Sequence, residues 1–412
     1  MTAAHPRRRV LHLINCLSTG GTERMLARLL RACDRDRFEH AVLTLLDDRD
    51  EAGGAPLRGG RSARRRIEPS PLRRSIESSG VETGSLGLRG ALSAPAALHA
   101  LRRTLIDRKP AVLCSWLYYA NAVAAATRRT LPRRPALLWN IRQGVPDLAR
   151  EPLRVRTAIR IGAWVSRRPG LGPQAIVYNS ASGAADHVRL GYPPSLERIV
   201  FNGLDPEEVT AGSEARTAAR RALGIDDDAL LVGAAGRDDP AKDHCGLVAA
   251  FARVSEALPA AHLLIAGPAA CALGSETPLM RAIAEFGVSR HISLLGLRDD
   301  WLRLLPGLDC FVSSSISEGF PNAVAEAMAA EVPVVATAVG ETEALLGPCG
   351  ALVPPSDPRQ LAEAILAALR LTPAARSSGG AASRARIAER FSMAAMASRY
   401  DAILESLAAH RE

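Results

Sequence analysis

The chain has 412 residues, which is too long for one ordinary domain and comfortable for two. Hydrophobic residues make up 47% and charged residues 23%, close to the average of soluble globular proteins, which excludes a disordered chain, a collagen-like repeat and a simple coiled coil. No apolar run reaches the length of about 18 residues that a membrane-spanning helix needs.

The positive charge comes almost entirely from arginine. The net charge is +9, and only Lys109 and Lys242 are lysines. Arginines cluster at residues 58–66 and again at Arg73 and Arg74. Such clusters bind nucleic acid or an anionic membrane, but no zinc-finger spacing or interleaved aromatic residues accompany them. We therefore do not expect nucleic acid as a partner, and two alternatives stay open for the cluster: contact with an anionic membrane surface, or a flexible insert without a role.

The cysteines and the start of the chain indicate the compartment. Seven cysteines are scattered singly without a C-x-x-C pair, and an odd number does not suit a disulfide framework, so a reducing cytoplasm is expected. The apolar run after the basic start is short and ends at Gly20 and Gly21 without a cleavage site. We interpret it as a buried first strand rather than a signal peptide.

Strands and helices alternate through the first half of the chain. Helices are expected at 22–32 and 96–107, and strands at 10–17, 41–46, 111–115, 136–141 and 175–179. Residues 47–95 are rich in Gly, Arg, Ser and Pro, so we predict mostly irregular structure there, with one short strand near 66–68. Alternation of this kind is typical of a parallel sheet covered on both faces.

The pattern weakens between Gly191 and Ser213 and then restarts, which predicts a domain boundary. The fold class predicted is α/β, with two Rossmann-like doubly wound domains facing a cleft: residues 1–195, residues 196–390, and a last helix over 391–412. Strands are expected at 230–234, 262–266, 292–295, 310–313, 334–336 and 351–353, and helices at 246–256, 278–286, 323–330, 358–369 and 393–409.

The densest group of polar residues lies in SEGFPNAVAEAMA, residues 317–329. Pro321 and Asn322 predict a helix start with Asn322 as the N-cap. Helix N-termini suit a phosphate, and Glu318 and Glu326 are placed to flank such a site. By their spacing alone, both glutamates are better explained as solvated helix-end charges, since glutamates eight positions apart are common.

Two further strings follow predicted strands. AAGRDDPAKDH, residues 234–244, contains Arg237 and Lys242, two cations that could clamp a diphosphate or simply lie on a polar surface loop. STGGTER, residues 18–24, places Gly21 where backbone can approach a ligand. It lacks the glycine spacing of a dinucleotide site and of a P-loop, so neither is expected.

Together these strings resemble the retaining family-four, or group-one, glycosyltransferases, and the resemblance covers nearly the whole chain. The best match runs from Ser317 to Gly347 and contains the Glu, seven residues, Glu pattern of that family. The resemblance implies the GT-B fold, with a last helix that crosses back to the first domain. Further matching strings are VYNSAS, IVFNGLD, LLGLRDD and LVPPSDP.

The resemblance also implies roles for single residues. Arg237, Lys242 and Glu318 would be the catalytic group: the two cations hold the donor diphosphate, and Glu318 binds hydroxyls of the transferred sugar. Glu326 would bind the ribose. The turn after Glu318 and the first glycine loop would contact the donor through backbone N–H groups. The donor-binding set is Gly21, Phe320, Pro321, Asn322, Ala323 and Glu326.

The strand LLWNIRQG, residues 137–144, departs from many relatives, which place a histidine where this chain has Arg142. Arg142 and Asn140 are assigned to the acceptor side, with a surface salt-bridge arginine as the alternative for Arg142. No metal site is expected, since no trustworthy DxD cluster occurs, and no cofactor is expected because the nucleotide-sugar is a substrate.

The function that these observations favour is transfer of a sugar, with retention, from a nucleotide-sugar to a hydroxyl acceptor, in bacterial surface-polysaccharide or glycolipid assembly. Expected partners are the nucleotide-sugar donor, a sugar or lipid-linked sugar acceptor and an anionic membrane surface. The expected location is the cytoplasm, with peripheral attachment to the inner face of the membrane. A nucleotide-sugar epimerase and a catalytically silent nucleotide-sugar binder are the alternatives.

Overall fold

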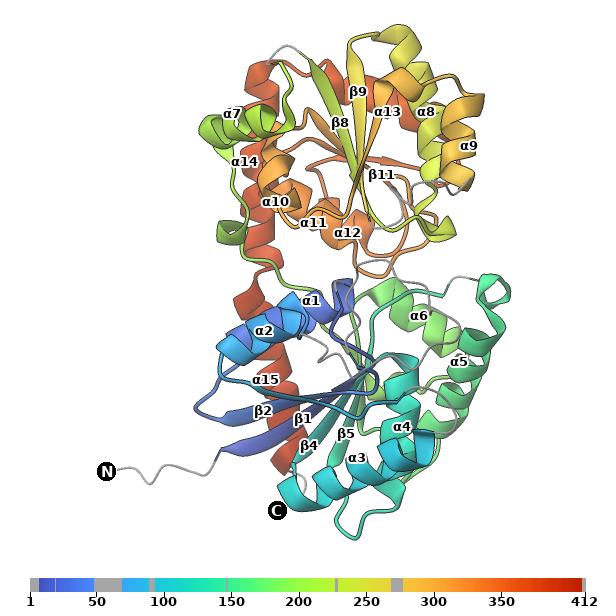
Figure 1. The fold of residues 1–412 in the computed structure, drawn as a ribbon, viewed down its shortest axis with the longest axis vertical. Coiled ribbons are helices and arrows are strands. Elements are labelled where there is room, and N and C mark those ends of the chain that lie inside the picture. The colour runs from blue at the N-terminus through green and yellow to red at the C-terminus, as the bar shows by residue number, and fades with distance from the viewer. Residues whose placement is uncertain are drawn as a thin grey trace, which may run out of the picture. The chain divides into compact units, whose positions relative to one another are not determined.

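The computed structural model divides the chain into two compact units (Figure 1). Unit 1 comprises Met1–Gly203 and Met393–Glu412, and unit 2 comprises Leu204–Ser392. The residues that the structure describes are 7–18, 20–47, 69–88, 93–145, 147–226, 229–267 and 277–409. The arginine cluster at 58–66 and the strand predicted near 66–68 lie outside them.

Unit 1 contains a parallel sheet with the strand order β3-β2-β1-β4-β5-β6-β7. Its strands alternate apolar side chains between two faces, so that Val10 and Ile14 belong to one core and Leu11 and Leu13 to the other. The strand bounds are β1 (Arg8–Ile14), β2 (Phe38–Thr44), β3 (Glu82–Ser85), β4 (Val112–Trp116), β5 (Ala136–Ile141), β6 (Ala175–Tyr178) and β7 (Glu197–Ile199).

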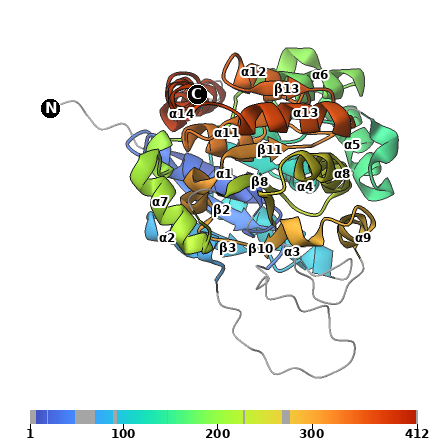
Figure 2. The ribbon, with the colours of Figure 1, turned by 90° about the horizontal axis from the view of Figure 1, so that it is seen from above.

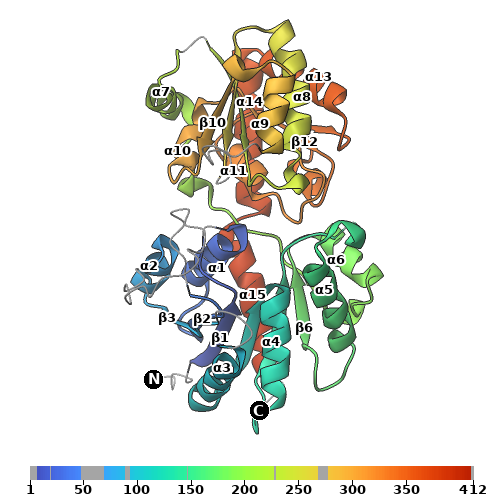
Figure 3. The ribbon, with the colours of Figure 1, turned by 45° about the vertical axis from the view of Figure 1, so that its right-hand side comes forward.

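Helices cover both faces of this sheet. One core joins the sheet to α1 (Gly21–Ala32), α2 (Pro71–Ser78) and α15 (Met393–Ala409). The other core joins it to α3 (Ala94–Arg108), α4 (Leu117–Arg129), α5 (Leu153–Ser166) and α6 (Ala181–Arg189). The last helix, α15, is thus part of unit 1, and Figure 3 shows it among the strands and helices of that unit.

Unit 2 repeats the same topology, with the strand order β10-β9-β8-β11-β12-β13 and all pairs parallel. The predicted α/β class with two doubly wound domains is therefore confirmed. The strand bounds are β8 (Leu230–Ala235), β9 (Ala261–Ala266), β10 (Ile292–Gly296), β11 (Cys310–Ser313), β12 (Val334–Thr337) and β13 (Ala351–Val353).

The helices of unit 2 follow its strands in turn. One face of the sheet is closed by α8, α9 and α13, whose apolar residues share a core with the strands, and Figure 2 shows α13 next to α8. The helix bounds are α7 (Gly212–Leu223), α8 (His244–Ala257), α9 (Pro278–Glu285), α10 (Trp301–Leu304), α11 (Asn322–Ala329), α12 (Thr342–Leu346), α13 (Pro358–Leu369) and α14 (Pro373–Arg390).

The segment predicted as mostly irregular contains regular structure over residues 69–88, so that prediction is wrong there. Ser70 caps α2 by accepting a hydrogen bond from the N–H of Arg73, and Ile76 is fully buried. Arg73 is also buried, and its guanidinium is satisfied there because it donates to Thr83 at 2.8 Å and to Thr44 at 3.2 Å. An arginine on the inner face hides the apolar periodicity by which a short helix is recognised.

Helix α14 was not expected, because its sequence contains SSGGAAS. Small residues form its packing face: a Cβ on Gly380 would lie 2.6 Å from the carbonyl oxygen of Glu331. Arginines then anchor the helix to backbone carbonyls, Arg384 to Val209 and Arg386 to Leu345. The helix is held by the close packing of its small residues against the backbone near Glu331 and by these hydrogen bonds, rather than by an apolar stripe.

Asp309 is a buried carboxylate at the start of β11, and three arginines surround it. Arg216 donates to it at 2.7 Å and Arg220 at 3.3 Å, while Arg376 of α14 forms a third ion pair. The N–H of Leu231 donates to the same carboxylate at 2.8 Å. Burial alone would raise the pKa of Asp309, but that N–H and the arginines lower it below the usual range.

Candidate functional site

The predicted site residues of unit 2 follow two adjacent strands. β8 and β11 are hydrogen-bonded neighbours at the point where the strand order reverses, and both are parallel. In open α/β sheets, ligands bind beyond the carboxyl ends of the strands at this switch point. The loop after β8 carries Arg237 and Lys242, and the loop after β11 carries Glu318. The topology therefore brings these two loops to one edge of the sheet.

The loop after β8 positions Lys242 through a short turn. Asp239 accepts a hydrogen bond from the N–H of Ala241 at 2.9 Å and starts a 3-10 turn over Pro240–Lys242. Asp243 ends that turn with a positive φ of 46° and caps α8 by accepting from Gly246 at 3.0 Å. The methylenes of Lys242 lie against Gly236, where a Cβ would be 3.2 Å from the nearest of them.

The two loops are joined by hydrogen bonds and by one ion pair. The N–H of Ile316 donates to the carbonyl of Ala241 at 2.8 Å, and the hydroxyl of Ser314 donates to the carbonyl of Lys242 at 2.8 Å. The Nζ of Lys242 then lies 2.5 Å from Oε1 of Glu318. Ser315 donates to the same carboxylate oxygen at 2.7 Å. The Lys242 and Glu318 side chains are 26% and 12% exposed, so the pair is reachable from solvent.

A third loop, after β12, supports Glu318 from the other side. The N–H of Glu341 donates to the carbonyl of Gly319 at 2.9 Å, and Thr337 donates to the carbonyl of Ser315 at 2.5 Å. Gly340 has a φ of +59°, and a Cβ there would lie 2.6 Å from the carbonyl oxygens of both Glu318 and Gly319. Only glycine fits this approach. Four supporting residues were not predicted from the sequence: Ser314, Ser315, Thr337 and Gly340. For Gly340, its place shortly after a strand was the available signal.

Helix α11 begins one residue earlier than predicted. The N–H groups of Val324 and Ala325 both donate to the carbonyl of Pro321, at 3.1 and 3.2 Å, and Pro321 has non-helical dihedral angles. Pro321 is therefore the N-cap, and the prediction of Asn322 as the cap is wrong. Asn322 and Ala323 are instead the first two residues of the helix, where backbone N–H groups point out of its end.

Phe320 and Glu326 differ in what they offer a ligand. The ring of Phe320 is buried and packs against Phe391 at a centroid distance of 5.7 Å. It can therefore offer a donor its backbone but not its ring. Glu326 lies in the second turn of α11 and is half-buried. Its side chain leans back towards the helix N-terminus, as helical side chains do.

Arg237 stands apart from the pair of Lys242 and Glu318. Its side chain is 75% exposed, and its guanidinium lies 3.9 Å from the carboxylate of Asp239. At that distance and exposure the ion pair holds the side chain weakly. Arg237 is thus free to turn towards an anion at the same strand end. Its assignment as a diphosphate ligand stays a prediction.

The other predicted residues belong to unit 1. Gly21 is the first residue of α1, directly after the loop that follows β1. Asn140 lies in β5, where its side-chain amide donates to the carbonyl of Ser115 at 3.1 Å and its oxygen accepts from Tyr400 at 2.6 Å. Their roles stay predictions.

Arg142 is a buried residue, so the alternative of a surface salt-bridge arginine is wrong. Its guanidinium donates to the hydroxyl of Tyr400 at 3.2 Å and to the side-chain oxygen of Asn202, and it lies 5.5 Å from the centre of the Trp116 ring. Burial lowers the pKa of Arg142. These contacts connect β5 to α15, and contact with an acceptor stays a prediction.

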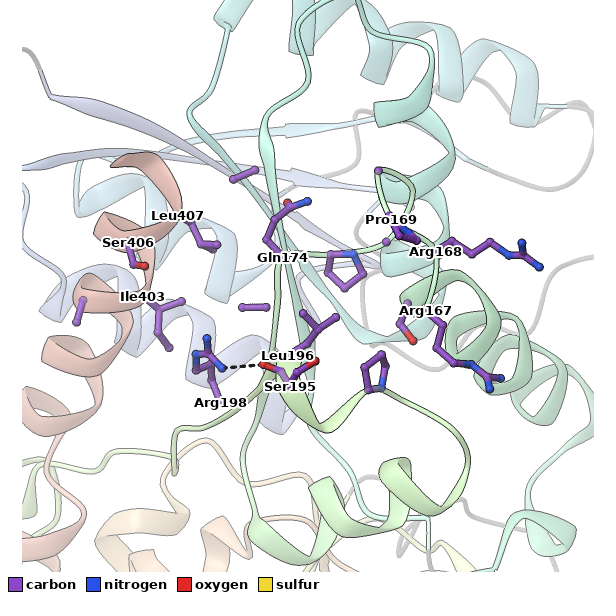
Figure 4. A pocket seen from close by; sticks show the side chains of 18 residues that line it. Arg167, Arg168, Pro169, Gln174, Ser195, Leu196, Arg198, Ile403, Ser406 and Leu407 are labelled. Carbon is purple, nitrogen blue, oxygen red and sulfur yellow. Dashed lines mark hydrogen bonds between the residues drawn. The ribbon is translucent and has the colours of Figure 1, made fainter. Parts of the chain in front are cut away.

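The cavity of about 850 Å³ in unit 1 lies elsewhere (Figure 4). Its walls come from the starts of β5, β6 and β7 and from α15, at the amino edge of the sheet, and Figure 4 shows Ile403 and Leu407 on one side and Arg167 and Arg168 on the other. Ligand sites of doubly wound sheets form at the opposite edge. Among the described residues there is no group of three or more His, Cys, Asp and Glu side chains able to hold a metal ion.

Comparison with known families gives one match in each unit. The family described as "Glycosyl transferases group 1" matches residues 229–370, and the "Glycosyl transferase 4-like domain" matches residues 20–203. One match falls on each unit, and together they cover most of the chain. The chain belongs to the group 1 glycosyltransferases, and the predicted family is confirmed.

Individual relatives are more distant. The D-inositol 3-phosphate glycosyltransferase of Corynebacterium urealyticum is 33% identical over 200 residues, which are 46% of this chain and 47% of that protein. The chain thus spans about half the length of the curated relatives it matches. The crystal structure of HepE from Anabaena in complex with UDP and glucose has a TM-score of 0.80 at 20% identity, covering 97% of this chain and 100% of that one.

A further solved structure is that of WaaG, a glycosyltransferase involved in lipopolysaccharide biosynthesis. It has a TM-score of 0.70 at 16% identity and covers 96% of this chain and 99% of WaaG. At these identities the two structural likenesses show the GT-B fold alone. That result confirms the fold that the resemblance implied.

Proposed function

We propose that this protein is a retaining glycosyltransferase that moves a sugar from a nucleotide-sugar to a hydroxyl of its acceptor. The observation that carries the proposal is the contact of Lys242 with Glu318 at the carboxyl edge of unit 2, beside the N-terminus of α11. An ammonium group and a helix N-terminus both suit phosphate, and a carboxylate suits sugar hydroxyls. Family membership supports the same reaction class.

In the proposed reaction, the bond between the sugar C1 and the diphosphate oxygen breaks while a bond from the acceptor oxygen to C1 forms. The acceptor proton passes to an oxygen of the leaving phosphate, so no side chain of the protein has to act as the base. Lys242, Arg237 and the N-terminus of α11 would stabilise the charge that develops on the diphosphate. Glu318 would accept hydrogen bonds from the transferred sugar, and Glu326 from the ribose. No metal or cofactor is part of this proposal.

A donor screen tests the proposal. The full chain would be heated with UDP-, GDP-, ADP- and TDP-sugars, and release of nucleoside diphosphate would be measured in parallel. We expect one donor to raise the unfolding temperature and to be slowly hydrolysed. With that donor, Glu326→Ala should raise the dissociation constant with little change in unfolding temperature. Stabilisation by no donor, or equal donor affinity for the parent and the Glu326→Ala variant, would contradict the proposal.

We further propose an acceptor class and a location for this reaction. We place the protein in the cytoplasm, peripheral to the inner face of the membrane, in assembly of a bacterial surface polysaccharide or glycolipid. WaaG, with the same fold, acts in lipopolysaccharide biosynthesis, which supports this class of acceptor. No described helix is long and apolar enough to cross a membrane. Transfer of radiolabelled sugar to an extracted lipid fraction would test this part, and transfer to water-soluble acceptors alone would contradict it.

A further inference from the structure

Helix α5 carries apolar side chains on its outer face. Ile159 faces the core of unit 1 and is fully buried. Leu153, Ile161 and Trp164 are instead 76%, 48% and 51% exposed. With Thr157 they occupy positions four, four and three residues apart, which places them in one stripe along the helix. Large apolar residues are normally scattered singly on a protein surface, so a stripe of three on one helix calls for an explanation.

The same helix and the turn after it are positively charged and contain no acid. The sequence from Pro152 to Gln174 has five arginines and no Asp or Glu. At 100° per residue, Arg154 lies on one side of the stripe and Arg156 and Arg160 lie on the other. Arg167 and Arg168 follow the end of the helix. The guanidinium of Arg168 lies 4.1 Å from the centre of the Trp164 ring.

Two of these arginines are available to an outside partner. Arg154 and Arg160 are exposed and form no ion pair or hydrogen bond with any side chain in the part of the chain that the structure describes. Figure 1 shows α5 at the margin of unit 1. The charge on this surface is therefore not neutralised by the protein itself.

We propose that the outer surface of α5, formed by Leu153, Arg154, Thr157, Arg160, Ile161, Trp164 and Arg168, binds an anionic lipid bilayer. The helix would lie in the plane of the interface, with the apolar stripe in the headgroup layer and the arginines next to lipid phosphates. Tryptophan favours that layer. Each arginine near an anionic surface strengthens the attraction to it. A nucleic acid would pair with the arginines but would offer no apolar layer to the stripe. A lipid bilayer offers both, so we favour lipid as the partner.

The inference deepens the membrane location given under the proposed function and rests on it. It also says which edge of unit 1 approaches the bilayer. α5 starts after the loop that follows the carboxyl end of β5, so Leu153 lies towards the edge where doubly wound sheets hold ligands. Vesicle binding requires neither donor nor sugar transfer, so failure of this inference and failure of the transferase proposal are separate results.

The tryptophans provide a direct probe. The chain has four, and Trp116, Trp139 and Trp301 are 0%, 1% and 8% exposed, whereas Trp164 is half exposed. We would add the full chain to phosphatidylcholine vesicles with and without phosphatidylglycerol. With phosphatidylglycerol, the emission should shift to shorter wavelength and become protected from iodide, and added salt should reverse both effects. Trp164→Phe should still bind but lose the shift.

Variants with a matched control complete the test. Arg154→Glu combined with Arg160→Glu should lower co-sedimentation with the anionic vesicles at least about tenfold. Arg253→Glu combined with Arg399→Glu changes the net charge equally at two exposed arginines of other helices and should bind like the parent. The inference is overturned if both double variants bind equally, or if the Trp164 emission responds to RNA or an acidic protein but not to the vesicles.

Discussion

The ammonium group of Lys242 lies 2.5 Å from the carboxylate of Glu318, although 76 positions separate the two residues in the chain. Each follows a buried strand, and the two strands are neighbours in the sheet. Each charged group thus satisfies the other. A phosphate bound at Lys242 would form a new ion pair with the ammonium group. A sugar bound at Glu318 would donate hydrogen bonds from its hydroxyls to the carboxylate, so both charged groups would keep a partner.

Replacement of Lys242 by alanine should lower donor turnover by about 10²-fold or more, because a positioned donor to developing negative charge is worth about that much. Nucleoside diphosphate release at saturating donor is the measurement. Lys109→Ala removes the other lysine, which is exposed in unit 1, and should leave turnover unchanged. Parental turnover in Lys242→Ala, with folding intact, would remove this residue from the catalytic group.

Gly340→Ala should damage the site although it replaces no charged residue. The new Cβ would lie 2.6 Å from the carbonyl oxygens of Glu318 and Gly319, so the loop that carries Glu318 must move. Gly287→Ala is the matched control, because Gly287 also has positive φ but has nothing within 4 Å of the new Cβ. Both variants should lose about 1–2 kcal/mol from the strained φ, but only Gly340→Ala should also lose donor affinity. Equal donor affinity in the two variants would show that the loop does not depend on Gly340.

Asp309→Asn should destabilise unit 2 by about 3–5 kcal/mol, because it removes the charge that compensates three arginines. Since the pKa of Asp309 is lowered by folding, its contribution is present above the unfolded pKa and is lost as the pH falls through the folded value. Urea unfolding at neutral pH and at about pH 3 would measure this. The difference in the free energy of unfolding between the parent and the variant should be smaller at the acidic pH.

Asp107→Asn, at an exposed carboxylate in α3, is the control for that experiment and should change the free energy of unfolding by less than about 0.5 kcal/mol. If the loss of unfolding free energy in Asp309→Asn were the same at both pH values, the charge of Asp309 would not be what stabilises the three arginines.

Tyr400→Phe should loosen α15 in unit 1. Burial raises the pKa of Tyr400, so its hydroxyl stays protonated and donates to Asn140 while it accepts from Arg142. Loss of this hydroxyl leaves both buried partners short of a hydrogen bond, which costs about 1–3 kcal/mol. Amide exchange along α15 should accelerate. Tyr119→Phe, at an exposed tyrosine, should have no effect, and an unchanged exchange rate in Tyr400→Phe would contradict the structural role given to this network.

Much of the fold was predictable, because buried parallel strands appear as short apolar runs bounded by turn residues. The strands at 136–141, 310–313 and 351–353 and the helices at 358–369 and 393–409 have the predicted bounds. The misses have a common cause. In α2 and α14, arginine, serine and glycine occupy positions that pack, and their partners lie on distant segments.

The candidate site was predictable in its residues but not in its contacts. The strings around Lys242 and Glu318 mark both positions, whereas the ion pair depends on the adjacency of β8 and β11 and on the backbone bond from Ile316 to Ala241. The burial of Arg142 depends likewise on Tyr400, which lies 258 positions away. Such long-range relationships leave no local pattern in a single sequence.

The place of α15 in unit 1 has a consequence for synthesis of the protein. Met396, Tyr400 and Leu404 fill the same core as Leu26 and Trp116, so the sheet made first lacks part of its cover until α15 leaves the ribosome. Residues 204–392 form a unit whose parts are all made earlier. Domains generally fold as units during synthesis, so the later half of this chain should complete its fold before the earlier half.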